Sequence, residues 1–160
     1  DTTVCMGAGI TAGLGLRHVL PEEQARRVVG VVGDSTFVHS GLTGIAEMVY
    51  NPPPTGYVVL VLDNGTTAMT GMQEHPATGR SLNHQPTNKL VIEDVARAMG
   101  VPNVVVSDHV AAGNDFAQAL KTALSSGGLW VIVARRPCVL AAARIRRHEH
   151  ANAERAANGS

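Results

Sequence analysis

Two short polar segments, each directly after an apolar run, hold the residue types best suited to chemistry. Gly33-Asp34-Ser35-Thr36 follows the run VVGVV, and Asp63-Asn64 follows YVVLVL. If both runs are parallel strands, their carboxyl ends lie at one sheet edge, where open α/β sheets bind ligands. Oxygen ligands from two adjacent strands would then meet there. The structural alternative is that Asp34 only caps the helix that follows it.

Other motifs around these glycines and hydroxyls are incomplete. A nucleophile elbow GxSxG needs glycine where this chain has Phe37, so we do not expect Ser35 to be a nucleophile. No strand is followed by GKS or GKT, which excludes a P-loop. Gly7-Ala8-Gly9 with Gly13 would let a helix N-terminus approach a diphosphate. Close packing of that helix on the sheet is the structural alternative, and nicotinamide binding is a weaker one because the spacing is GxGxxxG.

The surrounding sequence predicts an α/β fold, with a doubly wound, mainly parallel sheet flanked by helices. β-Branched runs indicate strands buried on both faces, and segments with helical spacing of apolar residues lie between them. This alternation is typical of right-handed βαβ units. We expect strands at 27–33, 56–62, 103–107 and 129–134, helices at 7–20, 41–50, 92–99 and 114–124, and a short extended piece at 3–5.

Two segments lack a regular period. Residues 64–90 are rich in Thr, Gly, Pro and His, and loops of that length are usually functional or disordered. At the C-terminus, alanine favours helix, but many charged residues leave little apolar face. We therefore predict one domain over residues 1–143 and an exposed polar tail or linker stub over 144–160.

Composition narrows the function classes further. With 160 residues, 44% of them apolar, the chain has the size of one globular domain. Thirteen basic and 13 acidic residues cancel, so we expect no general binding of nucleic acid or of an anionic membrane.

Cys5 and Cys138 alone cannot hold an iron–sulfur cluster, and the scarcity of cysteine favours a reducing, cytoplasmic setting. No apolar run approaches the roughly 20 residues of a membrane helix. The start at Asp1 suggests a processed product or a piece of a longer chain.

Taken together, the polar segments resemble the signature of thiamine diphosphate enzymes, which reads GDG, an intervening stretch, and NN. Here GDS at 33–35 and DN at 63–64 enclose residues 36–62, a similar length. GDSTFVHSGLTG, DNGTTAMTG and RRPCVL together look like the C-terminal thiamine diphosphate-binding domain of 2-oxoacid:ferredoxin oxidoreductases, in particular the α subunit of the indolepyruvate ferredoxin oxidoreductases. The resemblance covers Asp1 to about Arg144.

The resemblance implies a site for thiamine diphosphate and Mg²⁺ within residues 1–143. It assigns the metal to the Asp34 carboxylate, the Asn64 side chain and the Thr66 carbonyl, which suits the oxygen ligation that Mg²⁺ prefers. The implied cofactor contacts are Cys5, Gly7, Ala8, Gly9, Gly33, Asp34, Ser35, Thr36, Asn64, Thr66, Thr67, Met69 and Thr70. The chain departs from the family pattern at Ser35, where the family has glycine, and at Asp63, where it has asparagine. Neither departure removes a ligand.

Several residues keep two interpretations. His39 and His75 are candidates to hydrogen-bond an anionic intermediate, although a histidine in a polar loop is more often solvated or a local cap. Cys5 lies either near the cofactor or in the core as a small hydrophobe. Cys138 is expected to be structural, and Arg135, like Arg136, could meet a partner domain or a ligand.

The resemblance also implies that this chain holds only part of an active site. In the family, a glutamate on a separate pyrimidine-binding domain or subunit promotes cofactor activation, and iron–sulfur clusters on another domain or subunit accept electrons for ferredoxin. We therefore expect a hetero- or homo-oligomer that decarboxylates arylpyruvates such as indolepyruvate oxidatively, with coenzyme A as acyl acceptor. The alternatives are a subunit of a non-oxidative thiamine diphosphate-dependent 2-oxoacid decarboxylase and a non-catalytic binding module.

Overall fold

The computed structural model describes residues 4–108 and 115–157. Within them, four strands form one parallel sheet in the order β1-β2-β4-β3. The strands are β1 (Val29–Gly33), β2 (Tyr57–Asp63), β3 (Asn103–Ser107) and β4 (Leu129–Arg135). The four expected strands and their parallel arrangement are therefore confirmed, with small differences at the ends. Of the expected extended piece at 3–5, Val4 and Cys5 are not in a strand, and Thr3 lies outside the described residues.

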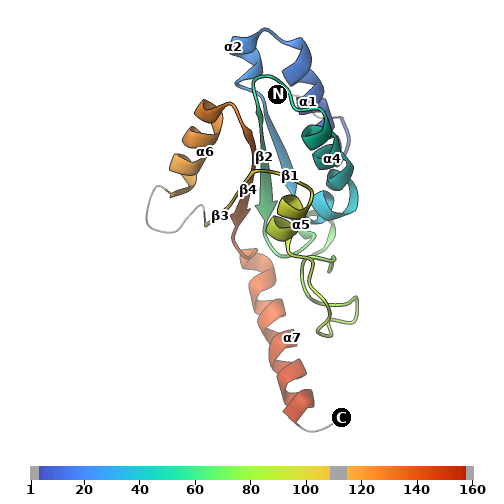
Figure 1. The fold of residues 1–160 in the computed structure, drawn as a ribbon. Helices are drawn as coiled ribbons and strands as arrows, with labels where there is room; N and C mark the ends of the chain where they lie inside the picture. Colours follow the sequence, from blue (N-terminus) through green and yellow to red (C-terminus); the bar gives the residue numbers. More distant parts are fainter. Residues whose placement is uncertain (1–3, 109–114, 158–160) are drawn as a thin grey trace.

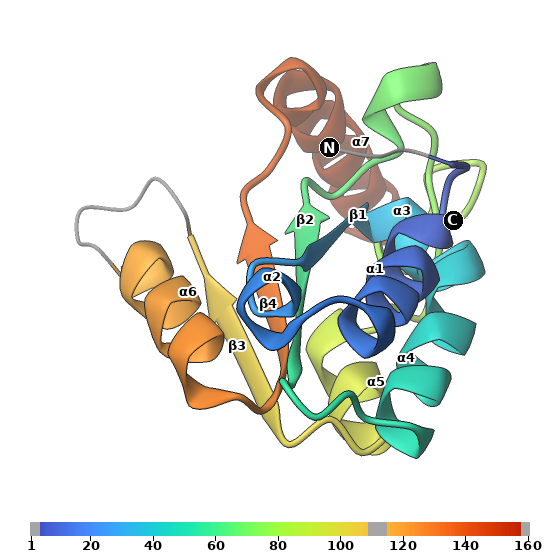
Figure 2. The same cartoon turned by 90° about the horizontal axis from the view of Figure 1, so that it is seen from above.

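Helices cover both faces of the sheet, which confirms the α/β prediction (Figure 1). Viewed from above, α1 (Ala8–Val19), α4 (Leu42–Tyr50) and α5 (Ile92–Ala98) lie on one face and α6 (Asp115–Ser126) on the other (Figure 2). The expected helix at 114–124 is α6, although Asn114 lies outside the described residues. Shorter turns are α2 (Glu22–Ala25), α3 (Asp34–Thr36), the π-helix η1 (Phe37–Gly41) and the 3₁₀ helix η2 (Ala68–Thr70).

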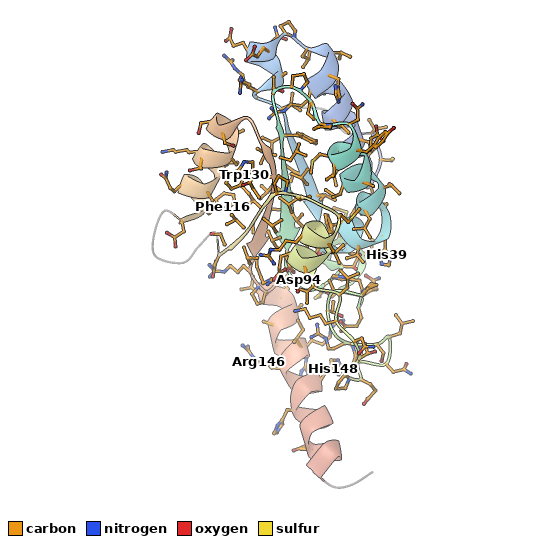
Figure 3. All side chains as sticks on the ribbon, viewed as in Figure 1. His39, Asp94, Phe116, Trp130, Arg146 and His148 are labelled. Carbon is orange, nitrogen blue, oxygen red and sulfur yellow. The ribbon has the colours of Figure 1, made fainter. Side chains whose placement is uncertain are left out.

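The main core lies between the sheet and α1, α4 and α5. Because successive strand residues point to opposite faces, Val59 and Val61 of β2 join this core while Val58 faces α6. The fully buried members of the main core include Ile10, Phe37, Ile45, Met48, Tyr57, Val131 and Val133. On the other face, Phe116 and Trp130 lie between α6 and the sheet (Figure 3). The core thus fixes the carboxyl ends of β1 and β2 side by side.

Tyr57 anchors the glycine-rich helix α1 on the sheet. Its buried hydroxyl lies 3.0 Å from the Ile10 carbonyl oxygen, to which it donates, and burial raises the pKa of Tyr57 to about 12. A Cβ added at Gly13 would lie 2.0 Å from the Tyr57 hydroxyl oxygen. Gly15, on the same helix, has open space around its Cβ position. The close-packing interpretation of Gly13 is therefore the one that the structure supports.

This difference gives a prediction for stability. Gly13→Ala is expected to lower the free energy of unfolding by about 1–2 kcal/mol, because overlap with Tyr57 outweighs the gain in helix propensity. Gly15→Ala should instead raise it by about 0.5–1 kcal/mol, since only the propensity changes. Urea unfolding of both variants measures the two effects. Equal stability of the two variants would show that the Tyr57 contact does not restrict Gly13.

The long segment after β2 and the C-terminal helix lie together at the carboxyl edge of the sheet (Figure 1). Helix α7 (Val139–Ala157) continues from β4, so the tail is helical as far as Ala157 and the predicted limit at 143/144 falls inside a helix. The His148 ring stacks on that of His84, with centroids 3.9 Å apart. Figure 3 shows His148 on the side of α7 toward the loop and Arg146 on the other side. None of the helices among the described residues is long and apolar enough to cross a membrane.

Candidate cofactor site

Asp34 joins the ends of β1 and β2. It begins α3 directly after β1 and is only 3% exposed. Its Oδ1 accepts the Ser35 N–H at 2.8 Å, while Oδ2 accepts the N–H groups of Asn64 at 3.1 Å and Gly65 at 2.8 Å. Two of these three bonds cross to the turn after β2, so Asp34 is more than the cap of its own helix.

The hydrogen bonds also set the charge of Asp34. Burial alone would raise the pKa of its carboxyl, but the adjacent His75 ring and hydrogen bonds from the backbone N–H groups of Ser35 and Gly65 outweigh this and lower the pKa. At neutral pH the group is therefore a carboxylate. A buried carboxylate at the end of a parallel strand is suited to bind a cation.

The neighbouring predicted residues form one network with Asp34. The Asn64 side-chain oxygen accepts the Thr66 N–H at 3.1 Å, and the Thr67 hydroxyl donates to the Ser35 hydroxyl at 2.9 Å. Ser35, which replaces the glycine of the family pattern, thus contacts the loop after β2. The three predicted metal ligands belong to this one network.

Two members of the predicted loop lie apart from this network. Met69 is 88% exposed, and the Thr70 hydroxyl donates to the Gln73 side chain within the loop. Both belong to η2, and both are exposed. The structure therefore does not bring these two residues to Asp34, and their cofactor contacts remain predictions.

A cavity of about 400 Å³ borders β1 and the start of α1. Its lining comprises Val4, Cys5, Met6, Gly7, Ala8, Gly9, Ala12, Val31, Val32, Gly33 and Thr36. Gly7 has φ 93°, and a Cβ there would lie 2.2 Å from the Ser40 hydroxyl oxygen, so glycine is required. A Cβ at Gly33 would meet no atom of the described residues within 4 Å. Cys5 is exposed, which contradicts its interpretation as a buried hydrophobe.

The two candidate histidines have different environments. His39 belongs to the π-helix η1, is exposed, and lies on the outer side of the ribbon in Figure 3. The His75 side chain is completely buried, with Nε2 3.4 Å from Asp34 Oδ2. Both residues contribute to the lining of a second cavity, of about 280 Å³. Proximity to Asp34 therefore distinguishes His75 from His39.

Arg135 and Arg136, whose roles the sequence left open, both lie near carboxylates of this chain. Arg135 donates from Nε to Asp63 at 2.7 Å and from its terminal nitrogens to Glu93 at 3.0 and 2.6 Å. Arg136 is 3.8 Å from Asp108. The half-buried Cys138 donates its backbone N–H to the Asn64 carbonyl at 2.9 Å, consistent with a structural role. The sequence analysis did not predict that Asp63 pairs with Arg135. The signal that could have indicated this pair is the aspartate at position 63, where the family has asparagine.

These residues fit a diphosphate carried on a magnesium ion. Among residues 4–108 and 115–157, no group of three or more His, Cys, Asp or Glu side chains is placed to hold a metal. Asp34 and Asn64 instead offer a carboxylate and an amide oxygen, the hard ligands that Mg²⁺ takes together with phosphate oxygens. The glycine-lined cavity borders Gly33 and Thr36, which flank Asp34 in the sequence, and the start of α1 is on its wall.

Comparison with known proteins agrees with this geometry. Residues 1–134 match the family described as thiamine pyrophosphate enzyme, C-terminal TPP binding domain. The chain is similar to the protein named indolepyruvate oxidoreductase subunit IorA of Archaeoglobus fulgidus, with 38% identity over 149 residues, which is 93% of this chain and 23% of the relative. The subunits of the same name from Pyrococcus horikoshii and Thermococcus kodakarensis are each 40% identical over 150 residues, covering 88% of this chain and 22% and 23% of the relatives.

The chain therefore spans less than a quarter of the length of the curated relatives it matches. Because the family match covers most of the sequence, including β1, β2 and the polar residues that follow them, the chain belongs to the family of C-terminal TPP-binding domains of thiamine pyrophosphate enzymes.

Proposed function

We propose that this chain is the diphosphate-binding part of a thiamine diphosphate-dependent 2-oxoacid:ferredoxin oxidoreductase that acts on arylpyruvates such as indolepyruvate. The observation that carries the proposal is the buried Asp34 carboxylate, which accepts the Asn64 N–H and lies in the sequence between Gly33 and Thr36, two lining residues of the glycine-lined cavity. The names of the similar archaeal subunits support indolepyruvate as the substrate. The position of Asp34 supports the cofactor class independently of those names.

In this proposal, the Asp34 carboxylate, the Asn64 side-chain oxygen and the Thr66 carbonyl hold Mg²⁺. Asn64 already accepts one N–H, and its amide oxygen has a second lone pair for the metal. Backbone N–H groups at the start of α1 and the hydroxyls of Ser35 and Thr67 bind the diphosphate. When bound, thiamine diphosphate supplies the nucleophilic carbon for the 2-oxo group of the substrate. This chain contributes binding, orientation and charge neutralisation.

Other domains or subunits supply the remaining functions in this proposal. They are a pyrimidine-binding unit with the activating glutamate, an iron–sulfur unit, ferredoxin as electron acceptor and coenzyme A as acyl acceptor, in a cytoplasmic hetero- or homo-oligomer. The similar archaeal proteins are named as subunits, which supports such an assembly. Reduction of ferredoxin by the assembled complex with indolepyruvate and coenzyme A distinguishes it from a non-oxidative decarboxylase, which would release the aldehyde without reducing ferredoxin.

Thermal unfolding of the chain tests cofactor binding directly. At about 100 times the dissociation constant, one ligand adds roughly 2.7 kcal/mol, which raises the midpoint by about 5–11 °C for a chain of this size. We expect this rise only when thiamine diphosphate and Mg²⁺ are both present, and none with NAD. A rise with NAD, or with thiamine diphosphate in the absence of any divalent cation, would contradict the proposal. So would the lack of a rise in both the chain and the assembled complex.

A further inference from the structure

His75 occupies an unusual position for a histidine of a polar loop. Its side chain has no exposed surface, and the Asp34 side chain that it faces is 4% exposed. His75 Nε2 is buried, lies 3.4 Å from Asp34 Oδ2, and makes no well-formed hydrogen bond to any residue that the structure describes. Buried polar atoms normally have a partner, so this contact is expected to have a function. Because the ring has no exposed surface and lies against Asp34, we expect no direct contact with a substrate.

The surroundings of the ring determine which nitrogen carries the proton. His75 Nδ1 accepts the backbone N–H of Ala77, at 3.4 Å, two residues further along the same loop. A nitrogen that accepts an N–H carries no proton itself, so the hydrogen-bond network assigns the ring proton to Nε2. Nε2–H therefore lies on the side of the ring toward Asp34, with Nε2 3.4 Å from Oδ2. In this tautomer the ring is neutral and places no positive charge beside the proposed cation.

The two oxygens of Asp34 differ in the number of their donors. Oδ2 accepts two backbone N–H groups, those of Asn64 and Gly65, and has the His75 ring 3.4 Å away. Among the described residues, Oδ1 accepts only the Ser35 N–H. Since each carboxylate oxygen has about two lone pairs, Oδ2 is saturated and Oδ1 has capacity left. The asymmetry directs one oxygen toward the protein and leaves the other for a ligand.

We propose that His75 is a positioning residue, which holds Asp34 Oδ2 through its Nε2–H and so presents Oδ1 to Mg²⁺, an inference that rests on the proposed cofactor function. It assigns His75 a role behind the metal ligand rather than in contact with substrate. A neutral donor serves this role better than lysine or arginine, whose fixed charge would compete with the cation. Fixing a ligand through a buried donor is a general way to preorganise a metal site.

Two variants of the full chain test the donor. His75→Phe removes Nε2–H but keeps a ring, whereas His75→Gln places an amide N–H near the same position. At fixed thiamine diphosphate, we measure the Mg²⁺ concentration that gives half of the maximal rise in the unfolding midpoint. We expect His75→Phe to raise this concentration at least tenfold and His75→Gln to change it less than threefold. Circular dichroism without ligands checks that both variants fold.

A measurement without ligands separates this inference from the proposed function. In the chain with ¹⁵N-labelled histidine at one neutral pH, NMR is expected to show the His75 proton on Nε2, none on Nδ1, and slow exchange with water relative to the exposed His39. A proton on Nδ1, or exchange as fast as that of His39, would overturn the inference. Unchanged Mg²⁺ dependence in His75→Phe, or equal loss in His75→Gln, would do the same. If the unmodified chain and its complex never respond to Mg²⁺ and thiamine diphosphate, the proposed function fails, while the NMR result still decides the contact.

Discussion

Replacing Asp34 by asparagine is expected to abolish the Mg²⁺-dependent rise in unfolding temperature that thiamine diphosphate produces. The change removes the negative charge that the hydrogen bonds around Asp34 maintain, and a neutral amide is a much poorer ligand for a hard cation. One amide oxygen can still accept the N–H groups of Asn64 and Gly65, so the variant should fold. We expect affinity for Mg²⁺ and thiamine diphosphate to fall at least 100-fold, measured by thermal unfolding over a Mg²⁺ series.

A matched control and a harsher substitution make this prediction specific. Asp94→Asn, in the exposed first turn of α5, removes the same charge from a side chain that pairs with Arg97, and it should leave the Mg²⁺ dependence unchanged. Asp34→Ala leaves three backbone N–H groups without their acceptor and is expected to lower the free energy of unfolding by about 3 kcal/mol. Undiminished Mg²⁺ dependence in a folded Asp34→Asn variant would reject Asp34 as a metal ligand.

The strands and the position of Asp34 could be predicted from the sequence because both depend on local patterns. Continuous apolar runs such as residues 57–62 indicate strands buried on both faces, and parallel pairing brings their carboxyl ends to one edge. That is sufficient to place Asp34 near Asn64. These patterns did not identify the cofactor, since a polar residue after a strand is common. The cofactor was identified from the joint resemblance of three segments to one family.

The contacts that hold these residues in place could not be predicted, because they join distant parts of loops without a period. Asp34 and His75 meet only after the loop following β2 folds back, and Arg135 meets Asp63 only because β4 pairs with β2. The π-helix η1 was also missed. Its extra residue per turn leaves no mark in the apolar spacing of so short a segment. The loop was correctly expected to be irregular, but its internal contacts depend on the whole fold.

The contact of Arg135 with two carboxylates leads to a prediction for stability. Arg135→Met is expected to lower the free energy of unfolding by about 2–3 kcal/mol at neutral pH, because Asp63 and Glu93 lose a charged partner while they are only 11% and 14% exposed. The value is below that of fully buried pairs since Arg135 itself is 35% exposed. Arg97→Met is the control, because its pair with Asp94 is exposed on both sides and should contribute less than about 0.5 kcal/mol. Urea unfolding measures both variants.

The pH dependence distinguishes loss of this charge pairing from loss of packing. The hydrogen bond from Arg135 lowers the pKa of Glu93 below its ordinary value of 4.5, against the opposing effect of burial. A carboxyl whose pKa is lowered by folding adds stability above its unfolded pKa, and this contribution disappears as the pH falls through the folded pKa. The difference between the unmodified chain and Arg135→Met should therefore be largest near pH 7 and shrink steadily below about pH 4.5. A difference that stays constant over this range would mean that Arg135 stabilises the fold through its packed side chain, and that the charge of Glu93 contributes nothing.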